Sequence, residues 1–285
     1  MNRSAQRLGI ALAIVLLTAT TSCESVGRML ENAPKPTASI KGVSFDGFDM
    51  QSLSLRFDVE VQNPYSLDLP VAKMDLGLSS RQQQFLAAHS TEQGTVPAKA
   101  ARVFPVLAKI EFATLLSTVA GIKPGAVVPY RADFGIGVDA PGVGRIDLPL
   151  RKEGEIPVPA VPDVSVQGIH WQNLSLQEAA ATLKLEIGNT NDFPIDLSQL
   201  AYTLALADVK VAETSLRNAT KFAPGQKQII EIPFALKPTD LGLAAFNMLR
   251  GSGAGYRFDG RLAGDTPFGP LSMPVSKTGR TTFTR

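Results

Sequence analysis

The sequence predicts a mainly β protein: two tandem immunoglobulin/fibronectin III-like antiparallel β-sandwiches, each with one short helix. Three observations predict this fold class. Apolar and polar residues alternate along short segments, turn-formers are frequent between them (24 glycines and 20 prolines in 285 residues), and the second half of the chain repeats the first. Alternation of period two is typical of strands with one buried face, and many short strands between turns favour a sandwich.

The duplication appears as matched residues at a nearly constant offset. The segment 38–45 (ASIKGVSF) corresponds to 164–171 (VSVQGIHW), which lies 126 residues later, and the same offset brings Asn63 onto Asn189. Further matches follow in the same order toward the C-terminal end of each half, with the offset staying between 125 and 128. Matches in order over such a distance indicate that one ancestral unit occurs twice.

We therefore predict two homologous domains, residues 37–157 and 158–285. Each has about 120 residues, which is enough to bury an independent hydrophobic core. The proline-rich stretch Ile156–Pro162 (IPVPAVP) joins them. Because proline-rich linkers are semi-rigid, we expect a limited range of domain orientations.

The expected order of elements is the same in both domains. About four strands come first, a short helix follows, and two more strands complete the unit. The clearest strand of each copy, at 53–61 and 179–187, alternates between apolar and polar side chains. These two strands are expected to contribute one buried face each.

One helix is expected in each domain, at Glu111–Ala120 and at Thr239–Arg250. Thr239 or Asp240 is the predicted N-cap of the second helix, and Gly251 the predicted residue at C′. Two interpretations of these apolar helices remain open. Each helix closes one end or edge of its sandwich, or it gates an apolar cavity between the sheets.

Composition and charge exclude some classes of function. The chain is 44% hydrophobic and 19% charged, which suits a globular protein. Its formal net charge is +2, and Arg3 and Arg7 are the only charged residues before Cys23. A chain that begins at Cys23 would therefore carry no net charge, which argues against nucleic acid as a partner.

The N-terminus predicts export and lipidation at Cys23, the only cysteine. Arg3 and Arg7 precede the apolar run Leu8–Leu17, which has the length of a signal-peptide core rather than of a spanning helix. Small residues then lead to Cys23, an arrangement that resembles a bacterial lipobox. We expect residues 1–22 to be a signal peptide, and a lipid on Cys23 to attach the chain to a membrane.

Further details bear on this anchor. Thr20 stands where a lipobox usually has leucine, so an ordinary signal peptide cut near Ser22 is the alternative. Without a second cysteine, a free thiol at Cys23 would be open to oxidation, which acylation prevents. Residues 23–36 would form a short tether, and Glu24 favours the periplasmic face of the outer membrane over retention in the inner membrane.

Both copies carry an asparagine motif where a predicted strand ends. The first reads VQNPY at 61–65 and the second reads NTNDFP at 189–194. Asparagine tolerates left-handed backbone and bonds neighbouring amides, while proline fixes φ, so such a pair ends a strand sharply. We favour this structural role over direct binding for the motif residues Asn63, Pro64, Asn189 and Asn191.

At these motifs the chain resembles the late embryogenesis abundant type 2 family, which includes the water stress and hypersensitive response domain. The resemblance covers both repeats, although the first copy has Tyr65 in the third motif position and the second has Thr190 in the middle. It implies a seven-stranded sandwich with a helix. It also implies non-enzymatic roles: protection under desiccation or other stress and, in some relatives, binding or transfer of lipids.

No arrangement of residues in the sequence indicates catalysis, a metal site or a cofactor. The two histidines, His89 and His170, lie far apart in the chain and have no cysteine partner, so we expect no zinc site. The segment Gly251–Gly255 follows a predicted helix, whereas a phosphate loop would precede one, so we interpret it as a turn. The nucleophile motifs of common hydrolases are absent from the sequence.

The sequence thus favours a non-enzymatic, membrane-anchored periplasmic lipoprotein that protects the cell envelope under stress. The alternative is binding or transfer of lipids or other hydrophobic ligands, and an envelope hydrolase is the least favoured class. A continuous apolar cavity of roughly several hundred cubic ångströms would favour the carrier, whereas a packed core would favour the protective module. The sequence indicates a membrane as partner and identifies no protein partner.

Overall fold

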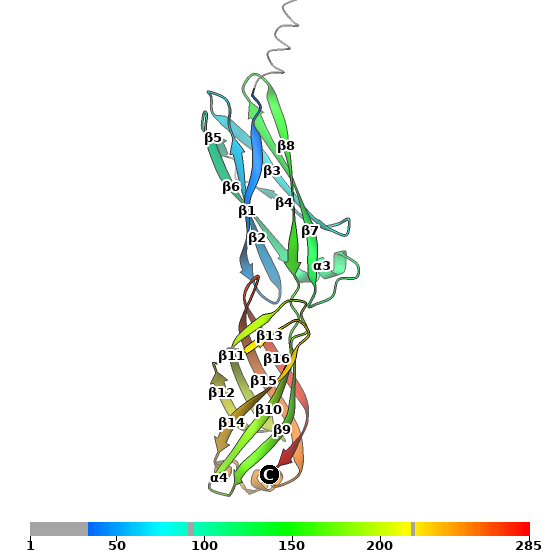
Figure 1. Cartoon of the computed structure of the whole chain (residues 1–285), viewed down its shortest axis with the longest axis vertical. Coiled ribbons are helices and arrows are strands. Elements are labelled where there is room, and N and C mark those ends of the chain that lie inside the picture. Colours follow the sequence, from blue (N-terminus) through cyan, green and yellow to red (C-terminus); the bar gives the residue numbers. More distant parts are fainter. Residues whose placement is uncertain (1–33, 91–93, 218–219) are drawn as a thin grey trace, which may run out of the picture.

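The structure is a computed structural model that describes residues 34–90, 94–217 and 220–285. Two β-sandwiches lie end to end along the long axis of the molecule (Figure 1). Cys23 and the rest of the predicted signal peptide and tether up to residue 33 lie outside the described residues. Within the described ranges, no helix is both long and apolar enough to cross a membrane.

The first domain packs two antiparallel sheets around one core. One sheet has the strand order β1 (Thr37–Phe48), β2 (Ser52–Gln62) and β6 (Ala101–Glu111). The other sheet has the order β4 (Gln83–Ser90), β3 (Leu69–Ser80), β7 (Val127–Ala140) and β8 (Gly144–Pro157), with β5 (Gly94–Val96) paired to β3. The chain passes from the first sheet to the second through the helix α3 (Phe112–Thr118).

The second domain repeats this plan. The counterparts of the three-stranded sheet are β9 (Asp163–Leu174), β10 (Ala179–Gly188) and β14 (Lys227–Leu236). The counterparts of the other sheet are β12 (Val209–Leu216), β11 (Ile195–Leu206), β15 (Gly253–Thr266) and β16 (Gly269–Thr284), with β13 (Thr220–Phe222) paired to β11. The matching order of strands agrees with the duplication seen in the sequence.

The two domains differ in how their last strand ends. The end of β16 pairs in parallel with β9, with Phe283 opposite Ile169 and Thr284 opposite His170. This pairing joins the two sheets of the second domain into one eight-stranded sheet. In the first domain β8 stops at Pro157, and the chain continues into the linker instead.

Each domain has its own hydrophobic core, built from the inward side chains of its strands. The alternate apolar residues of 53–61 on β2 are all buried, and Phe57 meets the rings of Tyr130 and Phe134 edge-on. The corresponding residues of 179–187 on β10 are buried as well. The predicted alternation is confirmed for both strands, and each large side chain buried in this way stabilises the fold by about 1.5–3 kcal/mol.

The first predicted helix is confirmed, whereas the second differs from the prediction. α3 lies within the predicted range 111–120 and packs on β4 and β6. In the second domain two short helices, α4 (Pro238–Leu241) and α5 (Leu243–Leu249), replace the single helix predicted at 239–250. Gly242 separates them because its φ of 88° lies in the left-handed region, which continues no α-helix.

The predicted N-cap of this helix was wrong. Thr239 and Asp240 lie inside α4, whose N-cap is Lys237 without a side-chain capping bond. Pro238 takes the first helical position, where its missing N–H would have no helical partner in any case. Gly251 does follow the C-cap of α5, as predicted.

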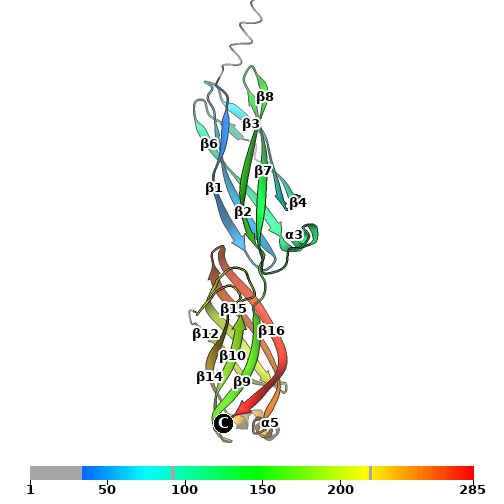
Figure 2. The ribbon, with the colours of Figure 1, turned by 45° about the vertical axis from the view of Figure 1, so that its right-hand side comes forward.

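Figure 2 shows α5 at the end of the second domain that lies opposite the first domain. Phe246 and Leu249 of α5 are buried there, as are Phe112 and Leu115 of α3 in the first domain. Each helix therefore covers apolar side chains at one end of its sandwich. This arrangement agrees with the first of the two interpretations of the apolar helices.

Charged side chains on the outer faces form ion pairs between neighbouring strands. Asp75 on β3 lies 2.7 Å from Lys73 Nζ and 2.7 Å from His89 Nδ1 on β4. Asp133 on β7 accepts a 2.9 Å bond from Arg151 Nε on β8. The bond from Lys73, and after it that from His89, lowers the pKa of Asp75, and the bond from Arg151 is the main cause that lowers the pKa of Asp133.

These lowered pKa values predict that acid destabilises the protein. A carboxyl group whose pKa in the folded state lies below its ordinary value of 3.8 stabilises the fold above that pH, and this stabilisation is lost as pH falls through the lowered pKa. We expect the free energy of unfolding, measured by urea denaturation, to decrease as the pH falls below about 5, most steeply below about pH 4. Asp133→Asn should make this decrease shallower, and an unchanged slope would contradict the assignment.

Candidate functional site

The first asparagine motif forms a closed network of backbone contacts at the end of β2. The side chain of Asn63 is buried, and its Nδ2 donates to the carbonyl oxygens of Leu67 (2.8 Å), Val96 (3.0 Å) and Pro97 (3.0 Å). Its Oδ1 accepts the N–H of Tyr65 at 2.9 Å. One amide thus joins the end of β2 to the loop before β3 and to the segment after β5.

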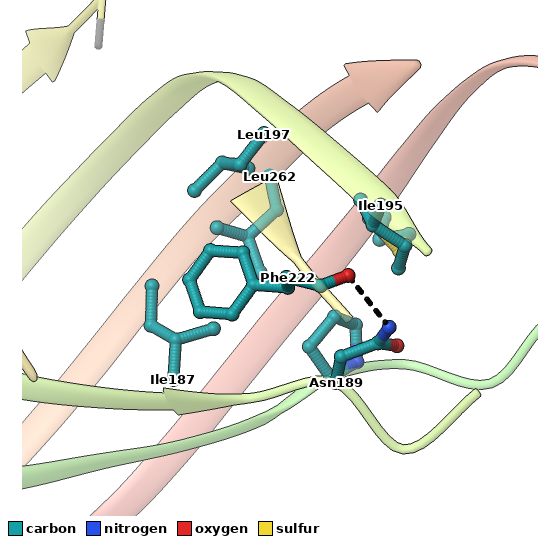
Figure 3. A pocket seen from close by; sticks show the side chains of 8 residues that line it. Ile187, Asn189, Ile195, Leu197, Phe222 and Leu262 are labelled. Carbon is teal, nitrogen blue, oxygen red and sulfur yellow. Dashed lines mark hydrogen bonds between the residues drawn. The ribbon is translucent and has the colours of Figure 1, made fainter. Parts of the chain in front are cut away.

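The second motif repeats the same contacts at the end of β10. Asn189 is buried, and its Nδ2 donates to the carbonyl oxygens of Phe193 (2.8 Å), Ala223 (3.2 Å) and Phe222 (3.4 Å). Figure 3 shows the last of these bonds beside the apolar residues that surround the turn. The Oδ1 of Asn189 accepts the N–H of Asn191 at 3.0 Å. The duplication therefore preserves a three-dimensional network and not only a sequence motif.

These bonds give both asparagines a structural task. A buried amide without partners costs about 1–3 kcal/mol, so a buried asparagine is stable only where both its oxygen and its nitrogen are bonded. In Asn63 and Asn189 both groups bond to the protein itself. The carbonyl of Pro64 likewise accepts a 2.6 Å bond from Lys99 Nζ. The geometry is that of side chains that hold a turn.

The side chain of Asn191 holds the linker between the domains. Its Nδ2 donates to the carbonyl of Ala160 at 3.1 Å, and its Oδ1 accepts the N–H of Ala160 at 2.7 Å. The same Nδ2 also lies 3.0 Å from Oδ1 of Asn189. Tyr65 occupies the equivalent position in the first motif. The two motifs therefore differ at the position whose side chain binds the linker in the second copy.

Gly125, in the loop before β7, completes the joint between the domains. Its N–H donates to the carbonyl of Val158 at 2.6 Å, and its own carbonyl accepts the N–H of Asp192 at 2.8 Å. Its φ of +94° is in the left-handed region, and a Cβ at this position would lie 2.6 Å from the carbonyl oxygen of Thr190. A loop of the first domain, the linker and the second asparagine turn are thus bonded backbone to backbone.

Aromatic side chains fill the rest of the joint. Phe268, at the tip of the β15–β16 hairpin, lies 5.4 Å from the ring of Phe45 on β1 and 5.5 Å from Phe193 of the second motif, edge-on to both. Phe48 and Met50, from the β1–β2 hairpin, pack against the core of the second domain. No local sequence pattern predicts these contacts, because the contacting residues lie far apart in the chain.

Two apolar pockets in the second domain are very small. One, shown in Figure 3, has a cavity volume of about 10 Å³ and is lined by Asn189 and apolar side chains that include Ile187 and Phe222. Another, around Leu200 and Ile230, also has about 10 Å³. A single water molecule needs about 10–15 Å³ by this measure, whereas ligand sites have roughly 300–1,000 Å³. Neither pocket can hold a lipid chain.

Two larger hollows lie open on the surface. One, of about 540 Å³, is lined by polar and charged residues that include Arg81 and Glu153. The other, of about 300 Å³, lies beside the first asparagine turn and includes Lys35 and Lys99. Both are open depressions, so they differ from the apolar cavity expected of a carrier.

Both histidines lie on the outer faces of sheets. His89 bonds to Asp75 and is largely exposed, and His170 Nδ1 lies 3.1 Å from Thr284 Oγ1, where β16 meets β9. Among residues 34–90, 94–217 and 220–285, no group of three or more His, Cys, Asp or Glu side chains is placed to hold a metal ion. Gly251 and Ser252 lead from α5 into β15, which begins at Gly253, so only the first two residues of the predicted turn at Gly251–Gly255 lie outside the strand.

Comparison with known proteins gives matches to both domains. Residues 58–154 and 184–279 match the family described as late embryogenesis abundant protein. A desiccation protectant protein Lea14 homolog of Glycine max is 29% identical over 139 residues, which is 49% of this chain and 91% of that protein. The late embryogenesis abundant protein Lea14-A of Gossypium hirsutum is 26% identical over 133 residues, 47% of this chain and 88% of that protein.

Solved structures give matches as well. The solution structure of an Arabidopsis thaliana protein is 23% identical to this chain. The match covers 46% of this chain and 86% of that protein, with a TM-score of 0.37. The solution structure of a late embryogenesis abundant protein is also 23% identical, covers 56% of this chain and 91% of its own, and has a TM-score of 0.37.

The geometry of the joint predicts that Gly125→Ala loosens it. The added Cβ would clash with a backbone oxygen and would force alanine into a left-handed conformation, so we expect a loss of about 1–3 kcal/mol in the stability of the joint. Faster tryptic cleavage at the exposed Lys123 and a broader particle shape in small-angle scattering would report this change. Gly142→Ala is the matched control, because Gly142 also has positive φ (75°) but has nothing within 4 Å of its Cβ position. Equal behaviour of the two variants would contradict the assigned role of Gly125.

Proposed function

The chain belongs to the late embryogenesis abundant protein family, and on that premise we propose that it is a non-enzymatic protein that protects the bacterial cell envelope during water loss. A lipid on Cys23 holds it to the periplasmic face of the outer membrane. The observation that carries the proposal is that both domains, and so most of the chain after the predicted tether, match one family, and that proteins named for desiccation are similar to this chain.

The surface of the fold suits a protein that remains folded while water is removed. Drying concentrates proteins, and exposed edge strands then tend to pair between molecules. The edge strands β6 and β14 each carry an exposed proline, Pro105 and Pro233, which cannot donate a hydrogen bond to a further strand. Charged side chains such as Lys109 and Glu231 flank them. These features oppose edge-to-edge aggregation.

The interior suits the same role. The buried amides of Asn63 and Asn189 find their partners within the protein, so these turns do not depend on bound water. The enclosed pockets described above have room for about one water molecule each. Turns whose buried amides bond only to the protein keep these contacts when the water activity falls.

The position of the first strand fits attachment through the N-terminus. Thr37 at the start of β1 pairs with Gln62, next to the first asparagine turn, whereas Phe45 near the end of the same strand reaches the joint. The chain therefore enters the first domain at the end that lies away from the second domain. A lipid on Cys23 would hold the first domain close to the membrane, and the second domain would extend away from it.

The two small pockets of the second domain do not support the alternative function, binding or transfer of lipids. Two enclosed apolar pockets of about 10 Å³ are far smaller than the roughly 300 Å³ or more that a lipid chain would need. The apolar side chains of α3 and α5 cover packed cores. We therefore favour protection over transport.

The proposed anchor predicts the outcome of replacing Cys23. The wild-type chain should fractionate with membranes, and its N-terminal peptide should carry the mass of a lipid on Cys23. Cys23→Ala should leave the protein unlipidated and absent from the outer-membrane fraction. A wild-type chain that is cleaved near Ser22 and recovered in the soluble periplasm would overturn the anchor and favour an ordinary signal peptide.

The protective role predicts a defect in drying. Cells of the producing bacterium that lack this protein should survive air-drying less well than wild-type cells, and survival in hydrated culture should be unchanged. Wild-type protein should restore survival, and Cys23→Ala should restore it less if protection acts at the membrane. Leu243→Ser, at a side chain that is 66% exposed on α5, is the control for a substitution away from the anchor. Equal survival with and without the protein would overturn the proposed function.

A further inference from the structure

We propose that the tethered end of the first domain rests on the lipid surface of the membrane. This inference depends on the proposed anchoring through Cys23. The surface in question, called the near end below, consists of the loop tips that carry Leu67 and Val143 together with Lys35 and Lys99. The anchor alone would attach the protein, whereas contact at the near end would also orient it.

The sheet register places these residues at one end of the domain. Val71 on β3 pairs with Val138 on β7, so the loop that carries Leu67 and the hairpin that carries Val143 leave this sheet on the same side. Leu67 is 61% exposed and Val143 is 50% exposed. Two apolar side chains at neighbouring loop tips therefore face away from the protein.

The other sheet brings the cationic groups to the same end. Gln62 at the end of β2 pairs with Thr37 and with Ala101, so the entry of the chain and the loop before β6 lie together. Lys35 and Lys99 are exposed there, and Lys99 Nζ is held 2.6 Å from the carbonyl of Pro64. Apolar tips beside lysines are the pattern of a surface that enters the headgroup region of a bilayer.

Nearby acids cancel only part of this charge. Asp139 lies in the hairpin of Val143 and is paired with Arg145 at 3.1 Å. Asp68, whose Oδ1 accepts the N–H of Ala98 at 3.0 Å, keeps its negative charge and offsets one of the two lysines. The near end therefore presents a cationic excess to an anionic lipid surface.

The end of the second domain that corresponds to the near end is covered by the first domain. With the offset of 125 that brings Pro149 onto Pro274, Val143 corresponds to Phe268. Phe268 packs between Phe45 and Phe193 at the joint. In the second copy a neighbour thus covers the hairpin tip, and in the first copy the corresponding tip is exposed.

The length of the tether indicates that the lipid surface is what the near end contacts. Pro34 lies about 11 residues after Cys23, so an extended tether spans at most about 37 Å and keeps the near end within that distance of the lipid surface. A short tether gives a high effective concentration, which makes a weak contact effective. A second copy is a poorer fit, because copies anchored in the same membrane would all turn their near ends toward that membrane.

The experiment uses the full lipidated chain in vesicles that contain an anionic lipid and a phosphatidylcholine with brominated acyl chains. Because the lipid blocks Cys23, Val143→Cys supplies a single thiol for an environment-sensitive fluorophore. Leu243→Cys is the matched control, since Leu243 is 66% exposed but lies on α5, at the opposite end of the molecule. We expect brominated lipid to quench the probe at 143 about twofold or more and to leave the probe at 243 nearly unchanged.

A second variant checks that the probe itself does not draw the domain to the membrane. Leu67→Ser combined with Lys99→Glu, in the Val143→Cys background, should reduce the quenching at 143 while the protein stays with the vesicles. Equal quenching in this variant would overturn the inference.

The remaining outcomes separate the inference from the proposed function. If the protein carries lipid and sediments with vesicles, but the probe at 143 is no more quenched than that at 243, the inference fails and the anchor stands. Energy transfer between probes at 143 and 243 on different molecules, without quenching, would show that a second copy covers the near end and would also overturn it. A chain without lipid on Cys23 that remains in solution would overturn the anchor and the inference together.

Discussion

The arrangement of this molecule depends on a buried carboxamide at the end of one strand in each domain. Asn63 and Asn189 each bond to several backbone groups that no strand could satisfy, because β2 and β10 end there and the chain must turn. In the second domain the same network extends through Asn191 to the linker and, through Asp192, to Gly125 of the first domain. The turn that ends a strand in one copy thus also determines how the two copies meet. The family motif is explained by this geometry without any ligand.

Duplication gave the two copies different neighbours, and their differences lie where the neighbours differ. The third motif position is Asn191 in the second copy, where its side chain binds the linker. In the first copy it is Tyr65, near the point where the chain enters the domain. The hairpin tip is Phe268 where it packs in the joint, and Val143 where it is exposed. Cores and strand order stay alike, since each domain must bury its own apolar faces. In these two comparisons the copies differ at the ends of the sandwiches and not in their interiors.

Much of the fold could be predicted from the sequence, because alternation along 53–61 and 179–187 is a local property of the chain. The break at Gly242 could not, since a glycine inside a helical pattern costs only about 1 kcal/mol and the surrounding packing decides whether the helix continues. The joint could not be predicted either. Phe45 and Phe268 are far apart in the chain, and nothing local to either residue indicates the other. The chemistry of the asparagines predicts a turn-forming role, and their side chains bond to backbone groups within the turns, but the contact of Asn191 with Ala160 required coordinates.

The parallel pairing of β16 with β9 has a mechanical consequence. The two strands run side by side in the same direction, so a pull on the start of β9 and on the end of β16 would slide them past each other. Their hydrogen bonds would then be loaded together in shear and would not open one at a time. The first domain has no such ladder between β1 and β8 among its described residues. Under tension along the molecule, the first domain would yield before the second.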